Sequence, residues 1–101
     1  MTQPLRIVFQ RRASQDVERI DAWCQANQTS APDLFLRELE RVLDAIALLP
    51  HLGALAKHSR LEGVRRIVLA KSRHHVYYRQ TVDAIQVLAV WHASRGQPPS
   101  L

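Results

Sequence analysis

The sequence predicts an α+β domain with the element order β-α-α-β-β-β, in which a helical hairpin packs on a small, mainly antiparallel sheet. Two stretches with helical spacing of apolar residues follow a short β-branched segment near the start of the chain. Three further β-type segments, joined by short polar connections, occupy residues 64–92. The chain of 101 residues is long enough for one such domain, spanning 1–101, but too short for two.

The first strand and first helix are expected at residues 5–9 and 13–27. The segment "LRIVF" is β-branched and ends in the charged "QRR", which favours a short strand. Three carboxylates lie near the start of the following helix, where the helix dipole favours anions. The apolar positions of that helix are Ala13, Val17, Ile20, Trp23 and Cys24, and we expect the tryptophan and the cysteine to be core residues.

A second helix is expected within residues 29–50. Ser30 and Asp33 have the spacing of a capping box, Pro32 falls in the first turn, where its missing N–H is harmless, and Pro50 ends the helix. The expected core stripe is Phe35, Leu39, Val42, Ile46 and Leu49. A loop of about a dozen residues follows, because Pro and Gly punctuate this stretch.

Three strands are expected at residues 64–70, 74–80 and 84–92, the last two forming a hairpin. Pairing Arg79 with Gln86 places Tyr77 opposite Leu88 and His75 opposite Val90. The side chains expected to face the helices are Val76, Tyr78, Ile85, Val87, Ala89 and Trp91. The opposite face is expected to carry His75, Tyr77, Arg79, Gln86, Leu88, Val90 and His92. A one-residue slip in register would exchange these faces.

The net charge of +5 is unevenly distributed along the chain. Residues 1–56 contain six arginines and seven carboxylates, whereas residues 57–101 contain eight cations and two carboxylates. Arginine accounts for most of the cations, and its planar guanidinium suits phosphate or carboxylate recognition. The second half therefore predicts a basic surface for an acidic partner or nucleic acid, although a solvated basic face has the same pattern.

Several classes of protein are excluded or disfavoured by what the sequence lacks. Cys24 is the one cysteine, so we expect no intramolecular disulfide and a reducing compartment. No apolar run approaches the roughly 20 residues of a membrane span, and the start of the chain has no signal-peptide layout, so we expect a cytoplasmic protein with no membrane partner. His74 and His75 are adjacent on a strand and point to opposite faces, which argues against a metal site, and no Gly-rich phosphate loop is present. We therefore expect no metal and no cofactor.

Four short motifs occur in an order that resembles the RelE/ParE superfamily of bacterial toxins. They are the "LLPHLG" end of the second helix, "EGVRRIVL", "HHVYYR" and "VLAVWHASR". The residues that carry the likeness are Gly63, Arg65, Val76, Tyr77, Tyr78, Arg79, His92 and Arg95. The likeness covers nearly the whole chain and is closer to the ParE branch.

The resemblance implies the toxin of a type II toxin–antitoxin system, held inactive by a cognate, ParD-like antitoxin. In the ParE branch it implies DNA gyrase as the target, so we expect a binding inhibitor rather than an enzyme, with no catalytic residues. We expect the target-binding basic face to comprise Arg65, Arg73, Tyr77, Arg79, His92 and Arg95.

Two alternatives stay open. A RelE-like ribosome-dependent mRNA endoribonuclease would bind nucleic acid and use His75 or His92 among several cations, because phosphodiester cleavage needs an acid and a base around one phosphate. The tail "GQPPSL" lacks the tyrosine that such members carry. The other alternative is a non-toxic family member that only binds antitoxin. For His92 alone, a bond to backbone at the strand end is the simpler expectation.

An apolar groove beside the second helix is the expected antitoxin site. Leu34, Leu36 and Leu43 fall beside the core stripe, and a domain this small leaves part of them uncovered. The alternative is that the loop after Pro50 covers them.

Overall fold

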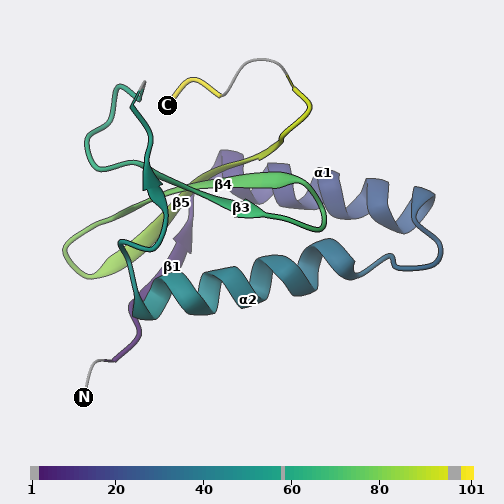
Figure 1. The fold of residues 1–101 in the computed structure, drawn as a ribbon, viewed down its shortest axis with the longest axis horizontal. Helices are drawn as coiled ribbons and strands as arrows, with labels where there is room; N and C mark the ends of the chain where they lie inside the picture. The colour runs from purple at the N-terminus through teal and green to yellow at the C-terminus, as the bar shows by residue number, and fades with distance from the viewer. Residues whose placement is uncertain (1–2, 58, 96–98) are drawn as a thin grey trace.

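The computed structural model describes residues 3–57, 59–95 and 99–101, and its elements follow the predicted order with one short addition (Figure 1). Gly96 and the following two residues of the tail lie outside the described residues. The elements are β1 (Arg6–Phe9), α1 (Arg11–Asn27), α2 (Leu34–Leu48), β2 (Ala54–Leu55), β3 (Arg65–Leu69), β4 (His74–Gln80) and β5 (Ala84–His92). The predicted α+β class and hairpin are confirmed.

The five strands form one sheet in the order β1-β5-β4-β3-β2. β1 pairs with β5 in parallel, and the other pairs are antiparallel. β5 is therefore a central strand with neighbours on both sides, which explains why its sequence is a nearly continuous apolar run rather than an alternation. The two-residue strand β2 was not predicted, because it lies within the segment expected to be a loop.

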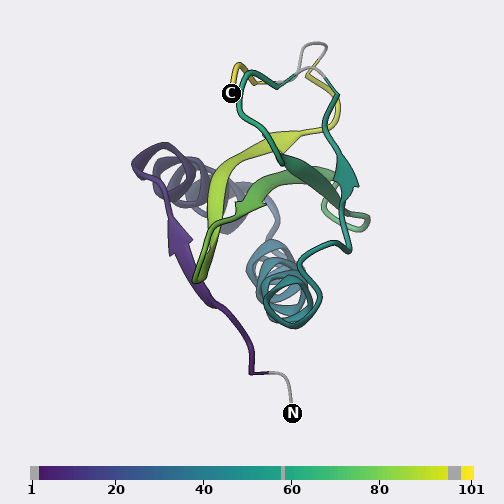
Figure 2. The same ribbon diagram turned by 90° about the vertical axis from the view of Figure 1, so that its left-hand side faces the viewer.

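The sheet separates two layers (Figure 2). α1 and α2 lie on one side, while the connection between β2 and β3 and the end of the chain lie on the other. The helix side holds the main core, where Ala13, Phe35 and Leu39 pack against Leu69, Val76, Val87 and Val90. The other side, here called the outer face, holds a smaller cluster around Val64, Tyr77, Leu88 and Ala89.

A β-bulge changes the predicted facing of the β4–β5 hairpin. Arg79 pairs with Gln86 as expected, but the register shifts next to Tyr77, so that Tyr77 pairs with Ala89 and His75 with Trp91. Leu88 is the extra residue, and every later position of β5 changes sides. The prediction that Ala89 and Trp91 face the helices and that Val90 and His92 face away is therefore wrong. Val90 joins the main core, and Trp91 packs on the outer cluster.

The start of α2 also departs from the prediction. Residues around Ser30 and Pro32 form turns, and α2 begins at Leu34 without a side-chain cap. Asp33 does not cap the helix, because its Oδ1 accepts a hydrogen bond from Gln25 Nε2 at 2.9 Å. The capping-box prediction is wrong for this reason.

Two apolar side chains expected in the core are exposed. Trp23 is 57% exposed and Leu49 is 61% exposed. Leu49 follows the last residue of α2, so it leaves the helical stripe that buries Phe35, Leu39 and Ile46. Cys24 is buried as predicted, and burial raises the pKa of its thiol.

Candidate functional site

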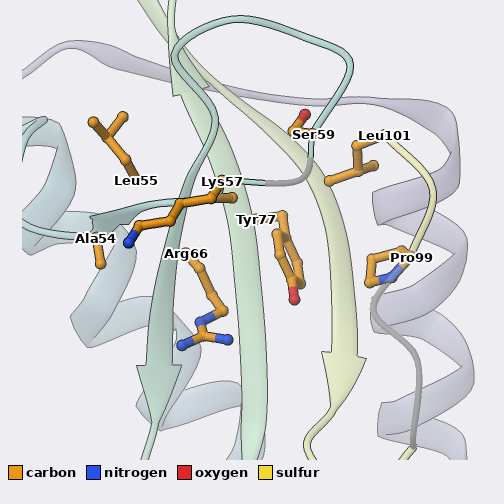
Figure 3. Close-up of a pocket in the computed structure, with 9 residues that line it drawn as sticks. Ala54, Leu55, Lys57, Ser59, Arg66, Tyr77, Pro99 and Leu101 are labelled. Carbon is orange, nitrogen blue, oxygen red and sulfur yellow. The ribbon is translucent and has the colours of Figure 1, made fainter.

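The outer face gathers polar and cationic side chains on adjacent strands. The register places Arg66 beside Tyr77, Val68 beside His75, and Arg79 beside Gln86. Successive side chains of a strand alternate in side, so Arg66, His75, Tyr77 and Arg79 share the face that the helices do not cover. Arg66, which is not among the predicted contact residues, is exposed and lies next to Tyr77 (Figure 3).

A cavity of about 290 Å³ opens on this face. Figure 3 shows Lys57 and Ser59 of the β2–β3 connection, Arg66 and Tyr77 of the sheet, and Leu101 around it. Among the described residues that line the cavity, two are cations and none is Asp or Glu. The cavity is therefore suited to an anionic group rather than to a cation. The alternation of side chains along "RRIVL" is the sequence signal for Arg66, because two consecutive arginines on a strand point to opposite faces and one of them must lie on the outer face.

His75 lies in a cationic environment on the outer face. Partial burial, then the charge of Arg66, then that of His92, lower the pKa of His75 below its usual range. Its ring is consequently neutral at neutral pH and able to accept a proton or a hydrogen bond. The histidine is half-buried, so a partner can approach it from the solvent side.

Tyr77 is a supporting residue rather than an exposed contact. Its side chain is buried, packs with Val64 and Leu88, and reaches only the wall of the outer cavity. Leu101 packs against the same cluster, and the amide of Arg60 donates a hydrogen bond to the carbonyl of Leu101 at 2.8 Å. The end of the chain thus covers part of the outer face.

Arg65 stabilises the scaffold. Its Nη1 donates to the Gly53 carbonyl at 2.7 Å and to the His51 carbonyl at 3.4 Å, and its Nη2 lies 2.8 Å from His51 Nδ1. The hydroxyl of Tyr78 donates to the Pro50 carbonyl at 2.9 Å and accepts from the Gly53 amide at 2.8 Å. The Pro-x-x-Gly turn, the Gly-x-Arg entry and the tyrosine-rich strand therefore meet in one hydrogen-bonded arrangement.

A Cβ added at Gly53 would meet the Tyr78 hydroxyl at 2.8 Å and the Arg66 carbonyl at 2.9 Å. The turn accordingly needs glycine at this position, because no other residue leaves room for these two contacts.

The remaining predicted residues divide between the two ends of the sheet. Arg79, half-buried, donates from Nε to Gln86 Oε1 at 2.9 Å near the β4–β5 turn. Arg73 lies at the opposite end, in the β3–β4 turn, where its carbonyl accepts from the Ala93 amide at 2.8 Å. The exposed Arg95 follows β5 at that same end. The predicted basic residues therefore do not converge on one point.

His92 lies on the helix side of the sheet, contrary to the prediction. Its ring meets His74 edge to face with centroids 4.9 Å apart, and His74 in turn contacts Phe35 of α2 at 4.9 Å. The amide of Ser94 donates to His92 Nδ1 at 3.1 Å, and the Ser94 hydroxyl lies 2.6 Å from the same nitrogen. The simpler expectation of a strand-end histidine bonded to backbone is confirmed.

Trp91 lies close to the guanidiniums of two arginines. The guanidinium of Arg95 lies 4.8 Å from the Trp91 ring centroid, and that of Arg12 lies 5.8 Å from it. Both distances are within the range of cation–π interaction. Arg12 was not predicted, because it comes from the start of α1, far away in the sequence.

Within the described ranges, no group of three or more His, Cys, Asp or Glu side chains has an arrangement that could hold a metal ion. No helix in the described part of the chain is long and apolar enough to cross a membrane.

Comparison of the whole structure finds solved structures with the same fold. The structure is similar to one titled "Chromosomal ParDE TA system from P. aeruginosa", with a TM-score of 0.70 and 17% identity over 92% of this chain and 100% of that chain. It is also similar to the E. coli DinJ-YafQ toxin-antitoxin complex (TM-score 0.61, 11% identity, 95% and 100% covered). The YoeB dimer from Staphylococcus aureus gives a TM-score of 0.61 at 18% identity, with 89% and 98% covered. The chain shares the α+β fold of these three structures.

The sequence itself identifies the family. Residues 7–96 match the family model described as "ParE toxin of type II toxin-antitoxin system, parDE". The chain therefore belongs to the ParE toxin family, and the predicted resemblance is confirmed. A comparison with curated proteins finds no match.

Proposed function

We propose that the chain inhibits growth by binding DNA gyrase through the cations of its outer face and its β5 end, and that a cognate antitoxin neutralises it. Membership of the ParE family and the fold shared with toxin–antitoxin complexes support the proposal. It also implies that the chain works in the cytoplasm, where the bacterial chromosome and its topoisomerases are found.

The observation that carries the choice of binding over catalysis is the position of His92. It lies on the helix side of the sheet, whereas His75, Tyr77 and Arg79 lie on the outer face. Cleavage of a phosphodiester needs an acid, a base and cations around one phosphate, and groups on opposite faces of a sheet do not meet this requirement. Dispersed, exposed guanidiniums instead suit recognition of an extended acidic surface.

The residues proposed to bind the target have unequal roles. Arg66, Arg73 and Arg95 are exposed and form direct contacts, and the half-buried Arg79 contributes beside Gln86. Tyr77 and Arg65 act by holding the surface in place, since one is buried and the other is bonded to the 51–53 turn. His92 contacts His74 on the helix side and does not touch the target, so its contribution is small.

The proposed antitoxin site is the apolar surface along α2. Leu34, Leu36 and Leu43 are half-buried, and the last two already pack against the core. The side chains of Leu48, Leu49 and Leu52, at and after the end of α2, are exposed. Exposed leucines of this kind favour a partner that covers them.

A ribonuclease remains a second candidate because of the outer cavity. His75 with a lowered pKa stands on the same face as Arg66, and Arg66 lines a cavity that also presents Lys57 and contains no acidic side chain among its described lining. This arrangement would suit a single RNA phosphate, with His75 rather than His92 as the base.

The test compares the two activities on one set of variants. The purified chain is assayed for inhibition of gyrase supercoiling and for ribosome-dependent cleavage of messenger RNA. For a binding inhibitor, Arg66→Gln, Arg79→Ala and Arg95→Ala each weaken inhibition by on the order of 1–3 kcal/mol, because each removes one charge-assisted contact. His75→Gln and His92→Gln change inhibition little.

Arg37→Gln is the matched control, since Arg37 is an exposed arginine on α2 and should leave inhibition unchanged. Cleavage of messenger RNA that falls about 10²–10⁴-fold in His75→Gln, with supercoiling unaffected by the native chain, would favour the ribonuclease. A chain without either activity that still binds its antitoxin would be a non-toxic member of the family.

A further inference from the structure

A second pocket lies on the helix side of the sheet, away from the outer face. It has a volume of about 360 Å³ and is formed between α1 and the end of β5. That volume falls in the range of small-molecule sites. Its polar and aromatic lining includes Arg19, Trp23, Gln28, His74, His92 and Arg95.

The pocket is cationic. Arg19 and Arg95 line it from different elements, and none of its described lining residues is Asp or Glu. Asp16 pairs with Arg19 Nη2 at 3.0 Å from outside the lining. Asp16 is itself fixed by accepting the buried amide of Val90 at 3.0 Å, so it anchors the Arg19 guanidinium at the pocket wall. Arg95 is exposed, and its guanidinium lies 4.8 Å from the Trp91 ring centroid. Two arginines lining one small pocket favour an anion, and a phosphate above all.

His74 supplies an unsatisfied polar atom. The residue is only 7% exposed, and its Nδ1 has no hydrogen-bond partner among the described residues. Burial and then the neighbouring His92 lower the pKa of His74 to about 4, so the ring is neutral. A buried nitrogen without a partner is unfavourable, and a ligand atom that bonds to it removes this cost.

Trp23 supplies an exposed aromatic side chain on the same pocket. Its side chain lines the cavity although it is 57% exposed. An exposed indole next to two guanidiniums can stack on a planar ring, as aromatic side chains do with nucleobases. Gln28 adds an amide that can both donate and accept hydrogen bonds.

We propose that this pocket binds a phosphate monoester carried on a planar heterocycle, a ligand of the mononucleotide class. Arg19 and Arg95 bind the phosphate, Trp23 stacks on the ring, and the unpartnered nitrogen of His74 bonds to a polar atom of the ligand. Arg19, Trp23 and His74 have no part in the proposed gyrase contacts, and Arg95 is the one arginine common to both proposals, so loss of nucleotide binding in Arg19→Gln or Trp23→Leu tests the pocket separately.

The experiment is calorimetric titration of the full chain with adenosine 5′-monophosphate, adenosine and inorganic phosphate. We expect the nucleotide to bind at least about tenfold more tightly than either fragment, because only the whole ligand uses both the arginines and Trp23. Arg19→Gln and Trp23→Leu should each weaken nucleotide binding about tenfold or more. The second variant replaces an exposed side chain, so a folding defect is not expected to obscure the result.

Arg11→Gln is the control, since Arg11 is an exposed arginine of the same helix that does not line the pocket. Unchanged nucleotide affinity in this variant supports the site. No binding of the nucleotide at millimolar concentration would overturn the proposal. Equal weakening in Arg11→Gln would also overturn it, because the attraction would then be a general effect of positive charge. Inorganic phosphate that binds as tightly as the nucleotide would overturn it as well.

Discussion

At the scale of single residues, similar side chains that are neighbours in the sequence have different roles. Tyr77 and Tyr78 are adjacent on β4 and both are buried, but they lie on opposite faces of the sheet. Tyr78 bonds to Pro50 and Gly53, whereas Tyr77 lines the outer cavity. Arg65 and Arg66 differ in the same way, one bonded to the 51–53 turn and the other exposed.

Tyr78→Phe should lower the free energy of unfolding by about 1–3 kcal/mol, because the buried Gly53 amide and the Pro50 carbonyl lose their partner. Chemical denaturation monitored by circular dichroism measures the change. Tyr77→Phe, in which no such pair of bonds is broken, serves as the matched variant and should cost much less. Equal losses in the two variants would contradict the assigned role of the Tyr78 hydroxyl.

Arg73 is a non-glycine residue with a positive φ of 61° in the β3–β4 turn. A Cβ at positive φ clashes with the backbone, which costs roughly 1–2 kcal/mol. Arg73→Gly should therefore be more stable to thermal or chemical unfolding than Arg73→Ala by about 1 kcal/mol. Both variants lack the guanidinium, so both should lose the same amount of target binding. A glycine variant no more stable than the alanine variant would show that the turn tolerates Cβ without strain.

At the scale of elements, long-range side-chain bonds join the helices to the sheet. Glu38 of α2 accepts the amides of Lys71 at 2.8 Å and Ser72 at 3.0 Å, and these bonds, opposed by burial, lower its pKa. Asp16 of α1 accepts the amide of Val90 in β5. His74 of β4 fits between Phe35 and His92. Titration of Glu38 and His74 therefore changes how firmly the layers are held.

Acidification should destabilise the fold between about pH 6.5 and pH 4, because His74 has a pKa of about 4 when folded and about 6.5 when unfolded. In this window the unfolded chain binds a proton that the buried ring does not. The free energy of unfolding therefore decreases as the pH is lowered, by at most about 3 kcal/mol. Unfolding experiments across this range measure the slope. His74→Phe should reduce it and leave the part due to His75, whose pKa is lowered in the same direction. Glu38→Gln should retain the slope at the upper end of the window, since the bonds from Lys71 and Ser72 lower the pKa of the carboxyl. An unchanged slope in His74→Phe would refute the assignment.

The elements were largely predictable, while the facing of their side chains was not. Periodicity and turn residues located both helices, and β4 and β5 have the predicted bounds. The bulge at Leu88 could not be predicted, because an extra residue in a central, uniformly apolar strand leaves no mark in the pattern. It reversed the sides of Trp91 and His92, and His92 is one of the six residues expected at the site. Strand β2 is too short to show a pattern, and Arg12 reaches Trp91 only through the folded arrangement of α1.

At the scale of the whole molecule, the sheet separates two kinds of surface. The outer face and the β5 end carry Arg66, Arg79 and Arg95, and the surface continuing from α2 carries exposed leucines such as Leu48 and Leu49. A toxin that must bind both a target and an antitoxin can use these surfaces separately. On the present proposal, neutralisation then follows from steric exclusion or from a change transmitted through the sheet, and the two binding functions are separable by substitution.

Leu48→Asp should weaken capture of the chain by its cognate antitoxin about tenfold or more while leaving inhibition of gyrase supercoiling intact. The leucine is 49% exposed, so the change removes an apolar contact and introduces a charge into the interface without disturbing the core. Arg66→Gln should weaken inhibition of gyrase and leave capture by the antitoxin intact, because the Arg66 guanidinium lies on the outer face. Binding is measured by calorimetry with the antitoxin, supercoiling by gel assay, and folding by the denaturation midpoint of each variant. If each substitution weakened both activities equally with unchanged stability, the two partners would share one surface, and the assignment of separate faces would have to be abandoned.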